Sequence, residues 1–187
     1  GKDFKPIGMS ERSQGHVKFN GTLDGNKKTI SGINYVNTNF KSGKYFGFVC
    51  VLGEAGTIRD LTLEGSMEAH TGCGGFVGRL FGTIDNCVNR IKTKATVGSG
   101  YQTGFAASAL NGSVISNSVN EADIEVDKSF AAGFVSAASS GSRIENCVNK
   151  GRIVTKSTSG AGIAAESSAY ITGCRNEAPV KARTIVG

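Results

Sequence analysis

Residues 75–89 contain two short motifs, Gly75-Phe76-Val77 and Ile84-Asp85-Asn86-Cys87-Val88-Asn89, and both recur along the chain. The first motif, with small variations, starts at positions 47, 75, 104, 133 and 162, so that successive copies lie 28, 29, 29 and 29 residues apart. The second motif returns at positions 84, 115, 144 and 171. Two motifs locked to one period are typical of a solenoid, in which each period is one structural unit stacked on the next.

The residues between these motifs predict strands and leave no room for a helix. Short alternating stretches of Val, Ile, Thr and Phe are bounded by Gly, Asn and Ser, which is the pattern of β-strands. In the third period we expect strands over residues 75–80, 83–88 and 91–97. The sequence therefore predicts an all-β fold: a right-handed parallel β-helix of about six coils of 28–29 residues, each coil one triangular turn.

The repeat also predicts the domain organisation. It covers nearly all of the 187 residues, so we expect a single β-helix domain over 1–187, with an irregular N-terminal segment at 1–15 and coils from 16 to 187. The sequence shows no capping element at residues 184–187, and an open coil presents bare strand edges. We therefore expect the chain to be a segment of a longer protein.

Alignment of the periods predicts columns of inward side chains, one above another at about 4.8 Å per coil. The three apolar columns are Ile30, Ile58, Ile84, Ile115, Ile144 and Ile171; Phe48, Phe76, Phe105, Phe134 and Ile163; and Leu61, Cys87, Ser118, Cys147 and Cys174. A fourth column consists of Asn89, Asn120, Asn149 and Asn176. We expect it to form a ladder in which each side-chain amide bonds the next coil, as Asn ladders do between stacked parallel strands.

Charge and hydropathy exclude some classes of function. The formal charge of +6 is spread over the chain, whereas a nucleic-acid-binding surface is a clustered basic patch, so no nucleic-acid partner is expected. No apolar stretch approaches the roughly 20 residues of a membrane span, so we expect no membrane insertion. Outward charges alternate in sign from coil to coil, as in Arg90, Glu121 and Lys150. The acidic residues at 121–127 are therefore predicted to form a charge-matched layer rather than a catalytic cluster.

The pattern of the five cysteines predicts that they are buried packing residues rather than disulfide or metal-binding residues. Their number is odd and there is no Cys-x-x-Cys, so neither a disulfide framework nor a zinc site is indicated. We expect no metal and no cofactor. Cys87, Cys147 and Cys174 occupy one position of the repeat and are predicted to be inward-facing and reduced.

The opening of the chain carries a further motif, residues 19–26 (Phe-Asn-Gly-Thr-Leu-Asp-Gly-Asn) followed by 29–33 (Thr-Ile-Ser-Gly-Ile), with Pro6-Ile7-Gly8 just upstream. This motif resembles the opening of the GLUG-motif family of bacterial β-helix repeat proteins, and Pro6-Ile7-Gly8 is similar to the segment that precedes it in that family. Residues 75–78 and 84–87 match its later elements. The resemblance covers roughly residues 4–178 and implies an adhesin-like or other non-catalytic part of a large secreted or cell-surface bacterial protein.

Two functions from different classes follow as hypotheses. The first is a non-catalytic extracellular or cell-surface module that presents a binding surface, with no catalytic residues. The alternative is a carbohydrate-active enzyme, a polysaccharide lyase or glycoside hydrolase, because Asp85 and Glu145 share one outward column two coils apart, near 9.6 Å by the strand spacing. Ice binding would require a regular Thr array, and the outward columns are mixed in charge and size.

If the module binds a ligand, the sequence points to the corner before the Gly-Phe column. Lys44, Tyr45, Tyr101 and Phe130 interrupt a run of small residues there. Aromatic rings at a corner can stack on sugar faces, so we expect a host glycan or a host surface protein as the partner. The oligomeric state is not predicted.

Overall fold

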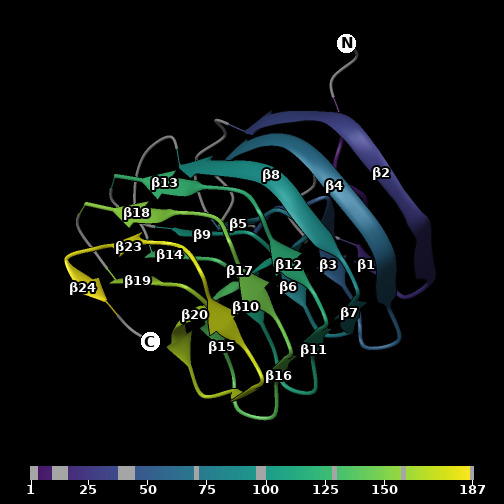
Figure 1. Cartoon of the computed structure of the whole chain (residues 1–187). Coiled ribbons are helices and arrows are strands. Elements are labelled where there is room, and N and C mark those ends of the chain that lie inside the picture. Colours follow the sequence, from purple (N-terminus) through teal and green to yellow (C-terminus); the bar gives the residue numbers. More distant parts are fainter. Residues whose placement is uncertain are drawn as a thin grey trace.

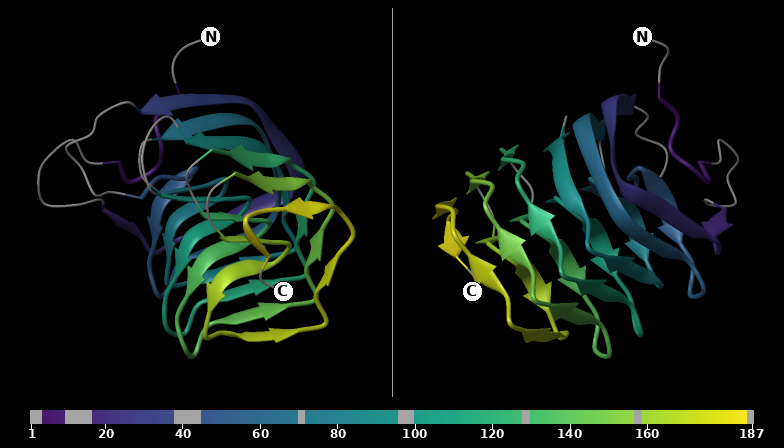
Figure 2. Two further views of the ribbon diagram at one scale, coloured as in Figure 1. Left: turned by 90° about the vertical axis from the view of Figure 1, so that its left-hand side faces the viewer. Right: turned by 45° about the vertical axis from the view of Figure 1, so that its right-hand side comes forward.

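The computed structural model describes residues 4–9, 17–37, 45–69, 72–95, 100–127, 130–156 and 159–185. Within these ranges the chain is all β, without a helix, and its parallel strands stack as a β-solenoid of about five turns (Figure 1). The coils lie side by side from the N-terminal to the C-terminal end of the solenoid (Figure 2). The predicted parallel β-helix is confirmed, with about five turns where about six coils were expected, and the right-handed sense of winding stays a prediction.

One coil is representative of the others. It runs through β10 (Ala106–Ala109), β11 (Val114–Ser116), β12 (Val119–Asn120), β13 (Ile124–Val126) and β14 (Phe130–Ala132). β11 and β12 are separate because the residue at position 117 takes a left-handed conformation, with φ of 51°, and bends the chain. The expectation of three strands per coil was wrong in this detail, because the described part of this coil contains five short strands, which belong to four sheets.

The first two sheets supply most of the wall. One sheet contains β1 (Lys18–Phe19), β3 (Val49–Leu52), β6 (Val77–Leu80), β10, β15 (Val135–Ala138) and β20 (Ala164–Ser167). The second contains β2 (Thr22–Asn37), β4 (Thr57–Ala69), β7 (Thr83–Asp85), β8 (Val88–Ala95), β11, β12, β16 (Arg143–Glu145), β17 (Val148–Asn149), β21 (Tyr170–Thr172) and β22 (Arg175–Asn176).

Two smaller sheets close each coil. One contains β5 (Cys73–Gly74), β9 (Tyr101–Thr103), β14, β19 (Ser159–Ala161) and β24 (Thr184–Ile185), and the other contains β13, β18 (Ile153–Thr155) and β23 (Val180–Lys181). Every strand pair in the four sheets is parallel, and each pair joins equivalent positions of neighbouring coils.

The phenylalanine column forms as predicted. The rings of Phe76 and Phe105 stack with centroids 4.9 Å apart, and those of Phe105 and Phe134 stack at 4.6 Å. All three side chains are wholly buried. At the N-terminal end, Phe4 stacks on Phe48 with centroids 5.4 Å apart, so residues before the first repeat extend the same aromatic column.

The isoleucine column is confirmed as buried from Ile58 to Ile144 and is wrong at its first member; its last member, Ile171, pairs in register with Ile144 but is 42% exposed. Ile115 pairs in register with Ile84 and Ile144. Leu23, not Ile30, pairs with Ile58; Ile30 pairs with Leu63 and is 38% exposed. The cause is the length of this coil: the register partners Leu23 and Ile58 lie 35 residues apart (58 − 23), whereas the expected pairing of Ile30 with Ile58 assumed 28.

The asparagine ladder is confirmed, and its first three members lie inside the coils, while Asn176 at its end is exposed. Nδ2 of Asn89 donates to Oδ1 of Asn120 at 2.8 Å, and the bonds from Asn120 to Asn149 and from Asn149 to Asn176 are both 2.7 Å long. Each Nδ2 also donates to a backbone carbonyl two residues further along its own chain segment. Asn89, Asn120 and Asn149 have no exposed surface, so these bonds are shielded from water.

The ladder explains why the two sequence motifs share one period. A Cβ atom added to Gly104 would overlap both the carbonyl oxygen of Gly133 and Oδ1 of Asn120. A Cβ atom added to Gly75 would overlap Oδ1 of Asn89 in the same way, and one added to Gly133 would overlap Oδ1 of Asn149. The glycine of the first motif is therefore required by the asparagine that ends the second motif, because the two pack against each other inside the coil.

The cysteine column is confirmed in position. Cys87 and Cys147 are buried, Cys174 is half-buried, and all five cysteines are free thiols. Burial, which disfavours the thiolate, is the main cause that raises the pKa of Cys73 and of Cys87 to about 12.

These two buried thiols predict a loss of stability in alkali. The thiols ionise near pH 9 in the unfolded chain and only near pH 12 in the folded protein. Their contribution to the free energy of unfolding is therefore complete below pH 9 and is lost as the pH rises toward 12. The free energy of unfolding is expected to fall by about 1.4 kcal/mol per pH unit for each thiol in this window. Urea unfolding at several pH values measures the slope. Cys73→Ala should make it shallower, and an unchanged slope would contradict this account.

Candidate functional site

Three of the four residues predicted to form a ligand patch lie together on the outside of the solenoid. The Tyr45 and Tyr101 rings stack with centroids 6.0 Å apart, and the Tyr101 and Phe130 rings are tilted by 49° with centroids 5.5 Å apart. Tyr101 and Phe130 are register partners in β9 and β14. Lys44 lies outside the described residues. We call Tyr45, Tyr101 and Phe130 the aromatic strip.

The strip is continuous because one coil has no side chain at this position. Phe46 forms a parallel β-bridge with Cys73, and Cys73 pairs in register with Gln102. The preceding residue in each case is Tyr45, Gly72 and Tyr101, so Gly72 lies in the coil between the two tyrosines. A Cβ atom on Gly72 would overlap Cδ1 of the Tyr45 ring. The Tyr45 ring therefore leans into the space above Gly72, which brings it to Tyr101.

Small side chains form the floor beside the strip. Phe130 packs against a buried cluster of Ala132, Ala161 and Ala165. Ala107 is also wholly buried, and its Cβ lies close to the Cβ position of Gly72. Bulky residues at these positions would lift the rings away from the wall, so the small residues set how closely the strip lies on the solenoid.

Two charged residues border the strip. The guanidinium of Arg79 lies over the Tyr45 ring, 5.0 Å from its centroid, which is a cation–π distance. Burial raises the pKa of Tyr101, with smaller contributions from the negative charge of Glu166 and from Tyr45. The Tyr101 hydroxyl therefore stays protonated at neutral pH and can both donate and accept a hydrogen bond.

The stacking limits how a ligand can use the rings. One face of Tyr45 and one face of Tyr101 are turned toward each other, so these faces are occupied within the strip. All three residues are half-buried. What the strip offers a ligand is the remaining ring surface, two phenolic hydroxyls, and the charges of Arg79 and Glu166.

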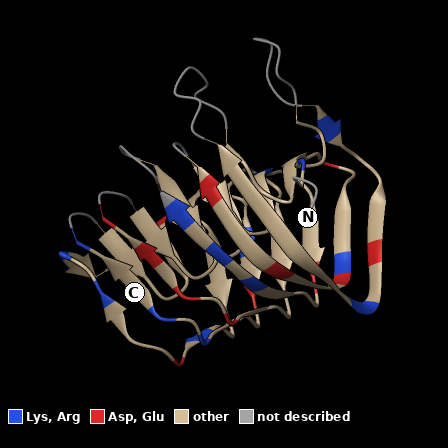
Figure 3. Cartoon of the chain, turned by 90° about the horizontal axis from the view of Figure 1, so that it is seen from above, with Lys and Arg blue, Asp and Glu red and all other residues tan. Residues whose placement is uncertain are grey.

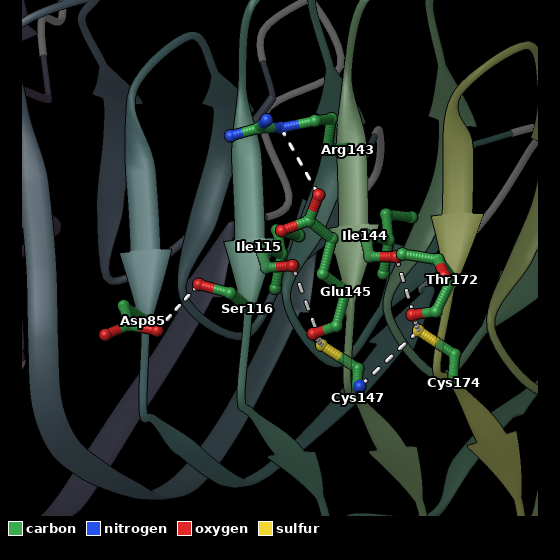
Figure 4. Close-up of polar contacts among 9 residues, drawn as sticks. All are labelled: Asp85, Ile115, Ser116, Arg143, Ile144, Glu145, Cys147, Thr172 and Cys174. Atoms are coloured by element: carbon green, nitrogen blue, oxygen red, sulfur yellow. Dashed lines mark hydrogen bonds and ion pairs between the residues drawn. The ribbon is translucent and has the colours of Figure 1, made fainter.

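The acid pair of the enzyme hypothesis is differently arranged. Asp85, Ser116 and Glu145 are register partners on β7, β11 and β16, so the two acids lie two coils apart as expected (Figure 4). Oδ1 of Asp85 accepts hydrogen bonds from Ser116 Oγ at 2.6 Å and Asn117 Nδ2 at 2.8 Å. Glu145 lies 3.4 Å from Arg143 on its own strand. Each carboxylate is thus engaged by neighbouring side chains rather than directed at a shared space.

An open groove of about 720 Å³ crosses the outside of β2, β4 and β8, and the sequence did not predict it. It is lined by Glu64, Arg90, Lys92, Glu121 and Asp123, together with smaller residues. Arg90 pairs with Glu121 at 2.7 Å.

Near this groove, acidic residues of one coil form ion pairs with basic residues of the next coil. Asp123 pairs with Arg152 at 3.6 Å, and Asp127 pairs with Lys156 at 2.7 Å. Acidic and basic segments alternate on neighbouring strands (Figure 3). The predicted charge-matched layer at 121–127 is therefore confirmed.

Gly72, Arg79 and Glu166 were missed by sequence reasoning. Gly72 carried a signal, because it is the aligned position at which neighbouring coils have an aromatic residue. Arg79 and Glu166 carried none, since their nearness to the strip follows from how the two sheets meet.

Other observations bear on partners and cofactors. Among the described residues, no group of three or more His, Cys, Asp or Glu side chains is placed to hold a metal ion. The described part of the chain contains no helix long and apolar enough to cross a membrane. Comparison of the chain with protein-family models, with curated proteins and with solved structures gave no match.

Proposed function

We propose that this chain is a non-catalytic, ligand-binding β-helix module, an adhesin-like part of a larger extracellular or cell-surface bacterial protein. Its ligand is a glycan, free or carried on a host surface protein, and it binds at the aromatic strip. The observation that carries the proposal is the convergence of three aromatic residues, 45, 101 and 130, into one contiguous strip. The bacterial and surface context rests on the resemblance to GLUG-motif proteins.

The chemistry of the strip suits a sugar. Exposed aromatic surface packs against the C–H faces of a pyranose ring, while phenolic hydroxyls bond its hydroxyl groups. Arg79 supplies fixed donors and Glu166 supplies acceptors at the border of the strip. A ligand that needed only apolar contact would leave these charged groups unused.

The carbohydrate-active enzyme remains the second candidate, with less support. Catalytic carboxylates of glycoside hydrolases flank the scissile bond and act on it together. Asp85 is held by Ser116 and Asn117, and Glu145 faces Arg143. The register of the two acids is the observation that keeps this candidate testable.

Tyr101→Ala is the first test of the proposal. This ring contacts both of the other rings, so its removal should weaken glycan binding at least tenfold, as expected for the central anchor of a small site. A glycan array identifies ligands, and titration calorimetry measures the change in Kd. Tyr170→Ala is the matched control, because Tyr170 is 71% exposed on β21, in a different sheet.

Gly72→Val keeps all three rings but fills the space that Tyr45 occupies, so it should weaken binding in the same direction. Thermal unfolding of each variant separates loss of the site from loss of the fold. Unchanged binding by folded Tyr101→Ala would overturn the proposal. Polysaccharide cleavage that disappears in Asp85→Ala would instead establish the enzyme.

A further inference from the structure

Arg79 differs from most other arginines of the solenoid wall because it has no acidic partner. The described arginines at positions 59, 90, 143, 152 and 175 each form an ion pair with a carboxylate. Among the described residues, none forms an ion pair with Arg79 or with Arg183. Arg79 is exposed on β6, and its guanidinium lies over the Tyr45 ring, 5.0 Å from the ring centroid. Its positive charge is thus available to a ligand.

The register of the strands explains why Arg79 lacks a partner. Elsewhere on the wall, opposite charges lie in neighbouring coils and form ion pairs. The positions equivalent to Arg79 are Val51 in the preceding coil and Ser108 in the following one, and Ala137 comes after Ser108. The next charged residue in this row is Glu166, three coils from Arg79, so that the two Cα atoms lie about 14 Å apart.

This row of residues and the aromatic strip together form a surface with a positive end and a negative end. Arg79 lies at the Tyr45 end of the strip. Glu166 is exposed at the Phe130 end, because it directly follows Ala165, a member of the alanine cluster against which Phe130 packs. Between the two charges, the row presents only two small, half-buried side chains, at positions 108 and 137. A ligand along the strip would therefore lie on a neutral floor between a cation and an anion.

The Tyr45 ring prepares Arg79 to bind an anion. A guanidinium that stacks on an aromatic ring keeps its N–H groups free at its edge, and these can bind a carboxylate or a sulfate through two parallel hydrogen bonds. Because the ring already restrains the side chain, less conformational entropy is lost when the anion binds. An unpaired, restrained cation beside the strip therefore favours an acidic ligand over a neutral one.

We propose, resting on the proposed function of the aromatic strip, that its ligand is an acidic glycan whose carboxylate or sulfate group binds Arg79. The neutral sugars of this glycan lie along the strip from Tyr45 toward Phe130. Arg79 is the residue that determines specificity for acidic sugars. Glu166 repels an acidic group at the Phe130 end and so fixes the direction in which the glycan lies.

The test compares acidic glycans with neutral counterparts that have the same backbone, using the whole folded chain. A glycan array carries each backbone in a sulfated form, in a form with carboxylates alone, and in a carboxyl-reduced, neutral form. Titration calorimetry on the backbone that binds most tightly should give a Kd about tenfold lower for an acidic form than for the neutral form. This difference should shrink as the salt concentration rises. The sulfated and carboxylate forms show which anion Arg79 prefers.

Arg79→Gln should remove the preference for the acidic form. We expect the Kd of the acidic glycan to rise about tenfold and that of the neutral glycan to stay nearly unchanged. A displaced Tyr45 ring would instead weaken both forms alike. Arg79→Lys, which keeps the charge but loses the paired N–H groups, should have an intermediate effect. Because Arg79 is exposed, the thermal unfolding midpoint should not change.

Two control variants and three contrary outcomes make the result decisive. Arg183→Gln removes the same charge from the other unpaired arginine and should leave both Kd values unchanged, whereas Glu166→Gln should tighten binding of the acidic form. Equal Kd values for acidic and neutral forms, or an acidic preference that survives in Arg79→Gln, would refute the inference; loss of binding in Tyr101→Ala would still support the proposed function. Binding of no glycan would refute both.

Discussion

Asn120→Ala is expected to lower the free energy of unfolding by roughly 3–6 kcal/mol, because several polar groups lose their partners inside the protein. Asn120 accepts from Asn89, and it donates to Asn149 and to the carbonyl of Ala122. Asn120 has no exposed surface, so water cannot replace these bonds without entering the coil. Equilibrium unfolding in urea, followed by circular dichroism, measures the loss.

The matched control is Asn176→Ala, at the exposed end of the same ladder. Asn176 accepts from Asn149 and donates to Ala178, but it is open to solvent, so water can replace its bonds. We expect its removal to cost much less than that of Asn120. Equal losses at the two positions would show that the ladder is not stabilised by its burial.

Phe105→Ala is expected to lower the free energy of unfolding by about 4–6 kcal/mol. The ring is wholly buried and stacks on Phe76 at 4.9 Å and on Phe134 at 4.6 Å. Its removal leaves a cavity in the middle of the column and breaks two ring contacts at once. Because each coil of a solenoid contacts only its neighbours, the loss should also uncouple the two halves of the protein.

The control for this variant is Phe130→Ala, which removes the same side chain from the half-buried aromatic strip. It should cost less stability while it weakens ligand binding. Thermal and urea unfolding test the first effect, and a broadened or two-step transition in Phe105→Ala would show the uncoupling. A loss for Phe105→Ala no larger than that for Phe130→Ala would contradict the role assigned to the inner column.

The repeat made most of the interior predictable. A period of 28 or 29 residues fixes which side chains lie one above another, so the columns at Phe105, Asn120 and Cys147 followed from alignment alone. The prediction failed at Ile30, because the register partners Leu23 and Ile58 of the first coil lie 35 residues apart (58 − 23) rather than 28. Alignment by a constant period cannot detect a coil of a different length.

The candidate sites were less predictable. The sequence singled out Tyr45, Tyr101 and Phe130 as residues that interrupt a run of small ones, but it did not show that their rings touch. Their contact depends on the absent side chain of Gly72.

The sequence by itself determined the all-β solenoid, its period, and the inward columns of phenylalanine, isoleucine, cysteine and asparagine. These features follow from local periodicity, because side chains that recur at one position of each coil must stack when the coils stack. The tertiary structure alone decided the packing of the motif glycines at 75, 104, 133 and 162 against asparagines of the ladder, and the closure of the aromatic strip over Gly72. These features depend on distances across the coil and on solvent exposure, which spacing along the chain does not specify.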